Sequence, residues 1–213
     1  MEENYVITIA RGFGTGGKVL AMRLAEELGI ECYEHRILAL CSQQSELQYE
    51  KYVNSDENIS NVGFWNRQLR KVKGITTPLP QKDRFIADDE LFARQTKVIN
   101  DLADSESCVI VGKCADYILK DRKNVISIYI EAPRRYCLKR IMDRMDVSES
   151  EAHRLISRTD RYRAEYYEYY TGGNYWTNPV NYDMTFNMER VGEDNCVEII
   201  KEYVSKKLGR QIC

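Results

Sequence analysis

The sequence predicts an α/β fold with a central parallel sheet, because short strands that are apolar throughout alternate with helical segments along the chain. A strand that is apolar on both faces must be covered on both faces, so helices are expected on either side of the sheet. The expected strands are residues 5–9, 108–112 and 125–130, with a late or edge strand over 182–187.

The first element is a strand over 5–9, which reads YVITI and is rich in β-branched residues. It leads through a glycine-rich loop into a helix that begins near Gly17. This helix carries leucine at 20, 24 and 28, the spacing of one helical face, and Gly29 supplies a left-handed stop.

The loop between them follows the G-x-x-x-x-G-K spacing of a phosphate-binding loop. Glycines let the main chain curl so that several N–H groups meet phosphate oxygens, and the next helix adds its positive end. The other interpretation is a flexible turn between strand and helix. The predicted phosphate-binding residues are Gly12, Phe13, Gly14, Thr15, Gly16, Gly17, Lys18 and Val19.

Residues 30–33 are expected to form a short second strand, and a helix is expected to open at Glu34. Arg36 is a candidate for binding an anion, although a surface arginine is the ordinary alternative. Residues 42–86 are polar with weak periodicity and contain two prolines. We interpret them either as an inserted, partly helical segment over a cleft or as a surface excursion with an aromatic anchor.

The next helix is expected to begin at Asp88 with an acidic first turn. Ligands of parallel sheets bind beyond the carboxyl ends of the strands, so the residues directly after each strand are candidates for ligand binding. Lys113 and Asp116 follow the third strand and could bind a phosphate and a sugar or base. The alternative is a helix start with an ordinary lysine. Glu131 follows the fourth strand in the same way.

Beyond Pro133 the chain becomes cationic, and its arginines recur at helical spacing. Guanidinium groups suit phosphoryl transfer, because they follow negative charge spread over several oxygens. Residues 148–167 look like two helices joined by a short turn, with Ser148 as a cap and Glu151 completing a capping box. A solvated charged hairpin is the alternative. The cationic side chains are Arg134, Arg135, Lys139, Arg140, Arg144, Arg154, Arg158, Arg161 and Arg163.

Composition narrows the class of protein. The 213 residues suffice for one substantial core, and the formal net charge of −2 argues against a general nucleic-acid or membrane binder. Seven scattered cysteines, never spaced C-x-x-C, favour a reducing cytoplasm over a disulfide framework or a zinc site. We expect no signal peptide and no membrane span.

Four segments together resemble the cytidylate kinase-like branch of the nucleoside monophosphate kinases. They are GFGTGGK with LAEELGI, VIVGKCADYIL, RTDRYRAEYYEYYTGGNYW and NYDMTFN. The resemblance implies one domain over 1–213 with a three-layer P-loop kinase fold and a central parallel sheet. It also implies a monophosphate-binding insertion at about 42–86, an arginine-rich helical lid at about 134–165, and transfer of the ATP γ-phosphate to a nucleoside monophosphate.

The resemblance also implies roles for individual residues. The catalytic cations would be Lys18, Arg135, Arg140, Arg158 and Arg161. The acceptor would be bound by Arg36, Lys113, Asp116, Asp160 and Arg163. Mg²⁺ would be held by nucleotide and water, with Asp116 or Glu131 reaching it through water and no direct protein ligand.

The chain departs from the family at two places. The family has Ser or Thr after the loop lysine and an Arg-Asp pair after the third strand, where this chain has Val19 and Lys113-Cys114. Val19 motivates a second hypothesis, a nucleotide-binding regulator without transfer; a kinase of another small molecule is a further one. An RNA-stacking surface over 162–182 is the weakest, because closely spaced tyrosines more often pack a lid on the core.

Overall fold

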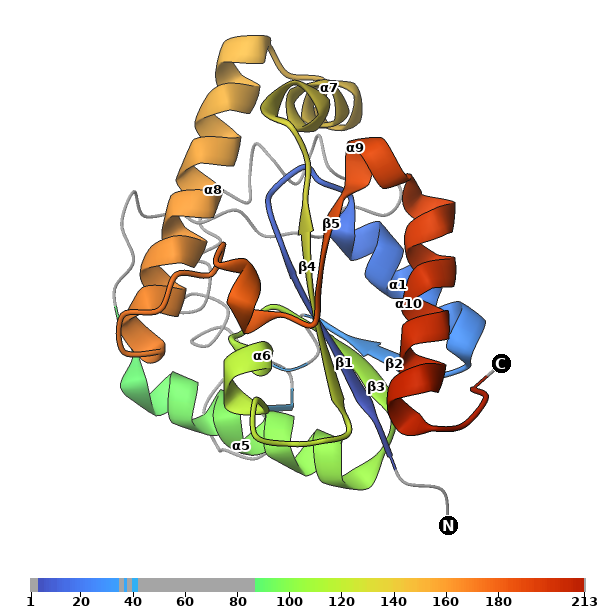
Figure 1. Cartoon of the computed structure of the whole chain (residues 1–213). Helices are drawn as coiled ribbons and strands as arrows, with labels where there is room; N and C mark the ends of the chain where they lie inside the picture. The colour runs from blue at the N-terminus through green and yellow to red at the C-terminus, as the bar shows by residue number, and fades with distance from the viewer. Residues whose placement is uncertain (1–3, 35–36, 38–39, 42–86, 213) are drawn as a thin grey trace.

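The computed structural model describes residues 4–34, 37, 40–41 and 87–212 (Figure 1). Its centre is a sheet of five parallel strands in the order β2-β3-β1-β4-β5. The predicted parallel α/β fold is confirmed. Arg36 and the segment 42–86 lie outside the described residues. The strands are β1 Val6–Arg11, β2 Glu31–Tyr33, β3 Cys108–Val111, β4 Val125–Glu131 and β5 Met184–Asn187.

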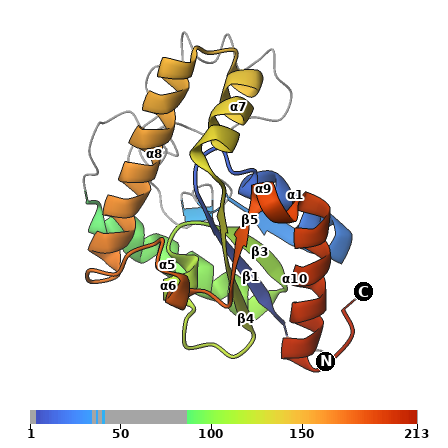
Figure 2. The same ribbon diagram turned by 45° about the horizontal axis from the view of Figure 1, so that its top comes forward.

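Helices cover both faces of this sheet (Figures 1 and 2). The helix α10 packs with α1 on one face, and α5 with α6 on the other. No helix in the described part of the chain is long and apolar enough to cross a membrane. The helices are α1 Gly17–Leu28, α5 Asp89–Ser105, α6 Ala115–Ile118, α7 Arg134–Met145, α8 Glu149–Tyr170, the short 3₁₀ helix η1 Pro179–Asn181, α9 Met188–Val191 and α10 Glu193–Leu208.

The central strands are mostly apolar because each of their faces is buried in a different layer. In β1, Ile7 packs in the cluster that contains Leu24 of α1 and Ile200 of α10. Val6, one residue earlier, points to the opposite cluster, where Ile99 of α5 lies. All five side chains are fully buried. The sheet therefore fixes the positions at which its carboxyl-terminal edge presents loops.

Helix ends follow the signals in the sequence. Gly29 closes α1 with a φ of 64°. The side chain of Asp88 accepts a hydrogen bond from the N–H of Leu91 at the start of α5. Ser148 accepts one from the N–H of Glu151 at the start of α8. These residues fix where α1 ends and where α5 and α8 begin.

The expectation of two helices within 148–167 is wrong. Residues Glu149–Tyr170 form one continuous helix of 22 residues. No Gly or Pro lies within it, so nothing in the backbone chemistry ends it early. The turn lies before it, where Asp146 adopts a left-handed φ of 52° between α7 and α8. Arg134 joins the two helices by donating to Ser157 Oγ at 2.7 Å.

The second half of α8 packs on the core through aromatic rings. Tyr170 stacks on Phe92 of α5 with ring centroids 3.8 Å apart. The hydroxyl of Tyr166 donates to Gln95 Oε1 at 3.0 Å, and Tyr167 is buried. Most of these tyrosines therefore pack α8 against the sheet layer, as the sequence predicted, while Tyr169 stays 54% exposed.

Candidate functional site

The glycine-rich loop lies where β1 ends and α1 begins, at the carboxyl-terminal edge of the sheet (Figure 1). Gly14 and Gly16 adopt φ values of 86° and 92°, which an L side chain rarely allows. The N–H of Gly12 donates to the carbonyl of Ile130 in β4 at 3.1 Å, so the start of the loop is tied to the sheet. The chain therefore curls as the phosphate-loop interpretation requires.

Thr15 braces the inside of the loop. Its hydroxyl is fully buried, donates to the Gly12 carbonyl at 2.9 Å and accepts from the Gly17 N–H at 3.3 Å. No side chain in the described residues caps α1, whose N-cap position is Gly16. The positive end of α1 is therefore open to an anion from outside the chain.

Glu34, which the sequence analysis did not select, holds the charges at the mouth of the loop. Its Oε2 lies 2.5 Å from Lys18 Nζ, and its Oε1 lies 3.2 Å from Arg11 Nη2. The Glu34 side chain is only 11% exposed. Its position directly after β2, at the edge where ligands bind, is the signal that could have identified it.

One pocket lies over the glycine-rich loop, and we call it the phosphate pocket. Arg144 of α7 faces it, and burial together with the nearby Arg140 lowers the pKa of Arg144. A Cβ placed at Gly16 would lie 3.1 Å from Arg140 Nη2, so Arg140 lies against the loop as well. The lining residues are Arg11, Gly12, Phe13, Gly14, Gly16, Gly17, Lys18, Glu34, Ile141, Arg144, Met145 and Arg163.

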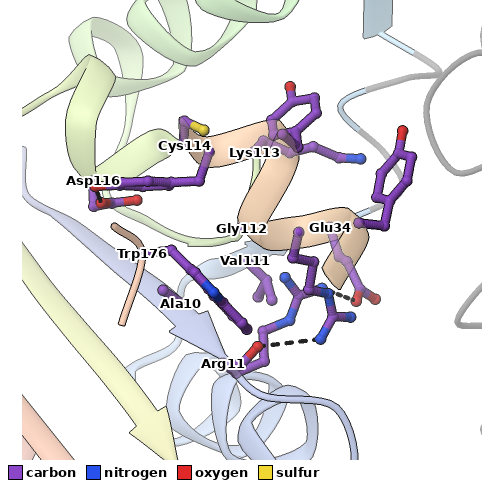
Figure 3. Close-up of a pocket in the computed structure, with 13 residues that line it drawn as sticks. Ala10, Arg11, Glu34, Val111, Gly112, Lys113, Cys114, Asp116 and Trp176 are labelled. Carbon is purple, nitrogen blue, oxygen red and sulfur yellow. Dashed lines mark hydrogen bonds and ion pairs between the residues drawn. The ribbon is translucent and has the colours of Figure 1, made fainter. Parts of the chain in front are cut away.

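A second pocket, which we call the aromatic pocket, adjoins it and encloses about 620 Å³, part of it open to solvent. Figure 3 shows Asp116 toward one end of it and the Arg11–Glu34 pair toward the other, with Trp176 between them. Arg11, Glu34 and Arg163 line both pockets. The other lining residues are Ala10, Val111, Gly112, Lys113, Cys114, Asp116, Tyr162, Tyr166, Tyr167 and Trp176.

Lys113 reaches the aromatic pocket from a strained turn. Gly112, Lys113 and Cys114 have successive φ values of 75°, 59° and 53°, which is costly for the two that are not glycine. Burial is the main cause that lowers the pKa of Lys113, to about 7, and the positive charges of Arg11 and Arg163 add to it. Arg11 and Arg163 supply positive charge here, and a bound phosphate would favour the protonated form of Lys113.

Asp116 lies in the wall of the same pocket and is 7% exposed. The hydroxyl of Tyr167 donates to its Oδ2 at 2.7 Å. Burial raises the pKa of Asp116 to about 6, although the bond from Tyr167 opposes that shift. A hydrogen-bonding group thus stands among aromatic rings at this end of the pocket.

Asp160 and Arg163 of α8 contact the glycine-rich loop itself. The N–H of Phe13 donates to Asp160 Oδ1 at 2.8 Å. Arg163 Nη1 donates to the Arg11 carbonyl at 3.1 Å and lies 3.8 Å from Asp160 Oδ1. Burial raises the pKa of Asp160 to about 6.

The remaining predicted cations are more dispersed. Arg135 is exposed and pairs with Glu189 at 2.7 Å. Arg158 is half-buried and Arg161 exposed on α8, and none of the three lines either of the two described pockets. The structure thus brings Lys18, Arg140 and Arg144 together at the loop.

Oxygen ligands for Mg²⁺ are few at the loop. Val19 has no hydroxyl, and the hydroxyl of Thr15 is engaged within the loop. Glu131 is held by the Tyr129 hydroxyl and the Ala132 N–H, whereas Glu34 lines both pockets. Mg²⁺ prefers one or two carboxylates together with substrate phosphates. The residues present fit a Mg²⁺ ion carried by a nucleotide, with Glu34 as the nearby carboxylate.

Comparison with known proteins places the chain in a family. Residues 6–190 match the cytidylate kinase-like family, so the chain belongs to that family. The resemblance inferred from the sequence motifs is confirmed. No curated protein sequence matches the chain.

Solved structures share the fold. An uncharacterised protein from Eubacterium ventriosum is 26% identical, with a TM-score of 0.68 over 95% of this chain and 99% of that one. Shikimate kinase from Bacteroides thetaiotaomicron gives 11% identity and a TM-score of 0.52 over 94% and 98%. Shikimate kinase from Acinetobacter baumannii, in complex with shikimate, gives 15% and 0.51 over 97% of each chain. The fold is that of the P-loop kinases, and together with the family it supports a kinase of a nucleotide or another small molecule.

Proposed function

We propose that the protein transfers the terminal phosphoryl group of ATP to a nucleoside monophosphate. The observation that carries this proposal is the junction of two pockets that share Arg11, Glu34 and Arg163. Direct transfer requires donor and acceptor phosphates to meet within one enclosed space. The phosphate pocket would take the donor, and the aromatic pocket would take the acceptor.

On the donor side, the loop from Gly12 to Val19 and the open end of α1 would hold the polyphosphate. Lys18 would exchange its contact with Glu34 for the outer phosphates, and Arg140 and Arg144 would stabilise charge that develops during transfer. Mg²⁺ bound with the nucleotide would neutralise phosphate oxygens, and Glu34 would lie beside it.

On the acceptor side, charge and ring chemistry both favour a nucleotide. Lys113 with Arg11 and Arg163 forms a positive end suited to a monophosphate. Trp176 and the tyrosines of α8 offer apolar walls for a planar base, and Asp116 offers a hydrogen-bonding partner. The acceptor is already an anionic oxygen, so the chain needs no general base. Arg158 and Arg161 remain proposed lid cations, and Arg36 remains a proposed anion-binding residue.

A coupled assay of ADP formation with a panel of nucleoside monophosphates tests the proposal. We expect turnover with at least one of them, and none with shikimate, the ligand of a similarly folded kinase. Turnover with only a non-nucleotide acceptor would show that the acceptor is another small molecule and not a nucleoside monophosphate. Absence of turnover with every acceptor would contradict the proposed kinase activity.

A second candidate is a nucleotide-binding regulator that transfers no phosphate. Val19 favours it, because the loop then lacks the hydroxyl that usually binds Mg²⁺. It requires ATP to bind equally well with and without Mg²⁺, whereas a kinase should bind the two forms differently. Calorimetric titration of ATP in EDTA and in Mg²⁺ separates the two functions. We also propose a cytoplasmic location, because the number and spacing of the cysteines in the sequence favour a reducing compartment.

A further inference from the structure

The helix α8 is hydrogen-bonded to the main chain on both sides of Gly12, where the glycine-rich loop begins. Asp160 Oδ1 accepts the N–H of Phe13 at 2.8 Å, and Arg163 Nη1 donates to the carbonyl of Arg11 at 3.1 Å. The two contacts bracket Gly12, where the loop begins. Residues some 150 positions apart in the chain thereby share one local structure.

The ring of Phe13 is held from the same helix. The guanidinium carbon of Arg163 lies 5.8 Å from the centre of the Phe13 ring, within the range of a cation–π contact. Phe13 is 8% exposed, and its main chain and its ring are both held by α8. The position of Phe13 therefore depends on where α8 lies.

The charge of Asp160 fits this structural contact better than contact with an acceptor phosphate. A carboxylate repels a phosphate, whereas a main-chain N–H is a suitable partner for it. The nearby Glu131 adds to the negative charge around Asp160. Asp160 also lines neither of the two described pockets.

We propose that Asp160 is a positioning residue that fixes the glycine-rich loop through the N–H of Phe13, with Arg163 holding the preceding carbonyl. The lid helix then sets the conformation in which the loop receives the donor. This assignment rests on the proposed function for its effect on nucleotide binding. It replaces the acceptor-binding role that the family resemblance implied for Asp160.

The test compares Asp160→Asn with Asp160→Ala. The Asn carbonyl can still accept the Phe13 N–H, whereas Ala removes the acceptor. Calorimetry with ATP alone should show affinity within about twofold of wild type for Asn and about tenfold weaker for Ala. Affinity for CMP alone should change in neither variant. Glu168→Ala, an exposed carboxylate on the same helix, is the matched control.

Hydrogen–deuterium exchange of the peptide over residues 11–17 gives a readout that needs no ligand. We expect faster exchange in Asp160→Ala than in wild type, and near wild-type exchange in Asp160→Asn. Equal loss of CMP affinity in both variants, with unchanged exchange, would overturn the positioning role and restore acceptor binding. If wild type binds no ATP, the proposed function fails, while the exchange comparison still decides the role of Asp160.

Discussion

The two pockets differ in how the chain builds them. The phosphate pocket is centred on one contiguous stretch, residues 12–18, held by glycine conformations and internal hydrogen bonds. The aromatic pocket gathers side chains from the ends of β1 and β2, the turn after β3, helix α8 and Trp176. The residues of a contiguous site are neighbours in the sequence, so their spacing can be read before the fold is known. The residues of a composite site come together only when the chain folds. The two pockets should therefore respond differently to substitution.

The largest effect is expected on the phosphate side, from Lys18→Ala. Loss of this cation beside the donor phosphates should lower kcat/KM by about 10²–10³-fold. Steady-state kinetics with saturating acceptor measure it. Lys123→Ala removes an exposed lysine before β4 and serves as the control. A change below about threefold would show that Lys18 does not contact the transferred group.

In the aromatic pocket, we expect the substitution Asp116→Asn to change the free energy of unfolding. Burial raises the pKa of Asp116 from 3.8 to about 6, so the folded chain favours the protonated carboxyl. Wild type should lose stability as pH rises from about 4 through 6, because the unfolded chain releases this proton first. The Asn variant avoids that loss and should gain up to about 3 kcal/mol at pH 8, and none below pH 4.

Denaturant unfolding at pH 4, 6 and 8 measures this difference. Asp121→Asn, at an exposed aspartate, is the control and should behave as wild type at each pH. Equal stability of wild type and Asp116→Asn at pH 8 would contradict the raised pKa.

A third comparison uses Lys113→Ala and Lys113→Gly. Both remove the amine that would bind the acceptor phosphate, so the KM of the acceptor should rise by about 10- to 100-fold while that of ATP stays constant. Only Gly suits the φ of 59°, so Lys113→Gly should be more stable than Lys113→Ala by about 1 kcal/mol. Kinetics and thermal unfolding read the two effects separately. A rise in the KM of ATP alone would move Lys113 to the donor side.

The smallest effects should separate two arginines of α7. Arg140 lies against Gly16, whereas Arg135 is 79% exposed and pairs with Glu189. We expect Arg140→Ala to lower kcat by about tenfold and Arg135→Ala by less than twofold. The same coupled assay measures both. Equal losses would mean that α7 reorients before transfer and brings Arg135 to the loop.

The fold was largely predictable from local chemistry. Strand 108–111 is apolar at every residue, and residues 125–130 are apolar at every position except Ser127, as is typical of a parallel sheet covered on both faces. The cap at Ser148 was predictable because its side chain satisfies one N–H three residues later, and Asp88 caps α5 in the same way. The turn expected within 148–167 was wrong, because no Gly or Pro interrupts the helix Glu149–Tyr170.

The contiguous loop of the candidate site was predictable from its spacing, and Lys113 and Asp116 were predictable because they follow a strand. The loop from Gly12 to Lys18 follows from spacing, but Glu34, Arg11 and Trp176 owe their importance to neighbours distant in the chain. The roles assigned to Arg158 and Arg161 stay predictions. For Asp160 the family resemblance implies an acceptor-binding role, whereas its contact with the Phe13 N–H motivates the positioning role proposed above.

The unbroken course of α8 has a mechanical consequence. At 22 residues it is about 33 Å long, and its aromatic second half is bound to the core. A rod held over its second half pivots near its middle, so a tilt of about 10° would carry its free end, about 16 Å away, by about 3 Å. Asp160 lies near the middle, close to the fulcrum, where the same tilt displaces the Phe13 contact far less.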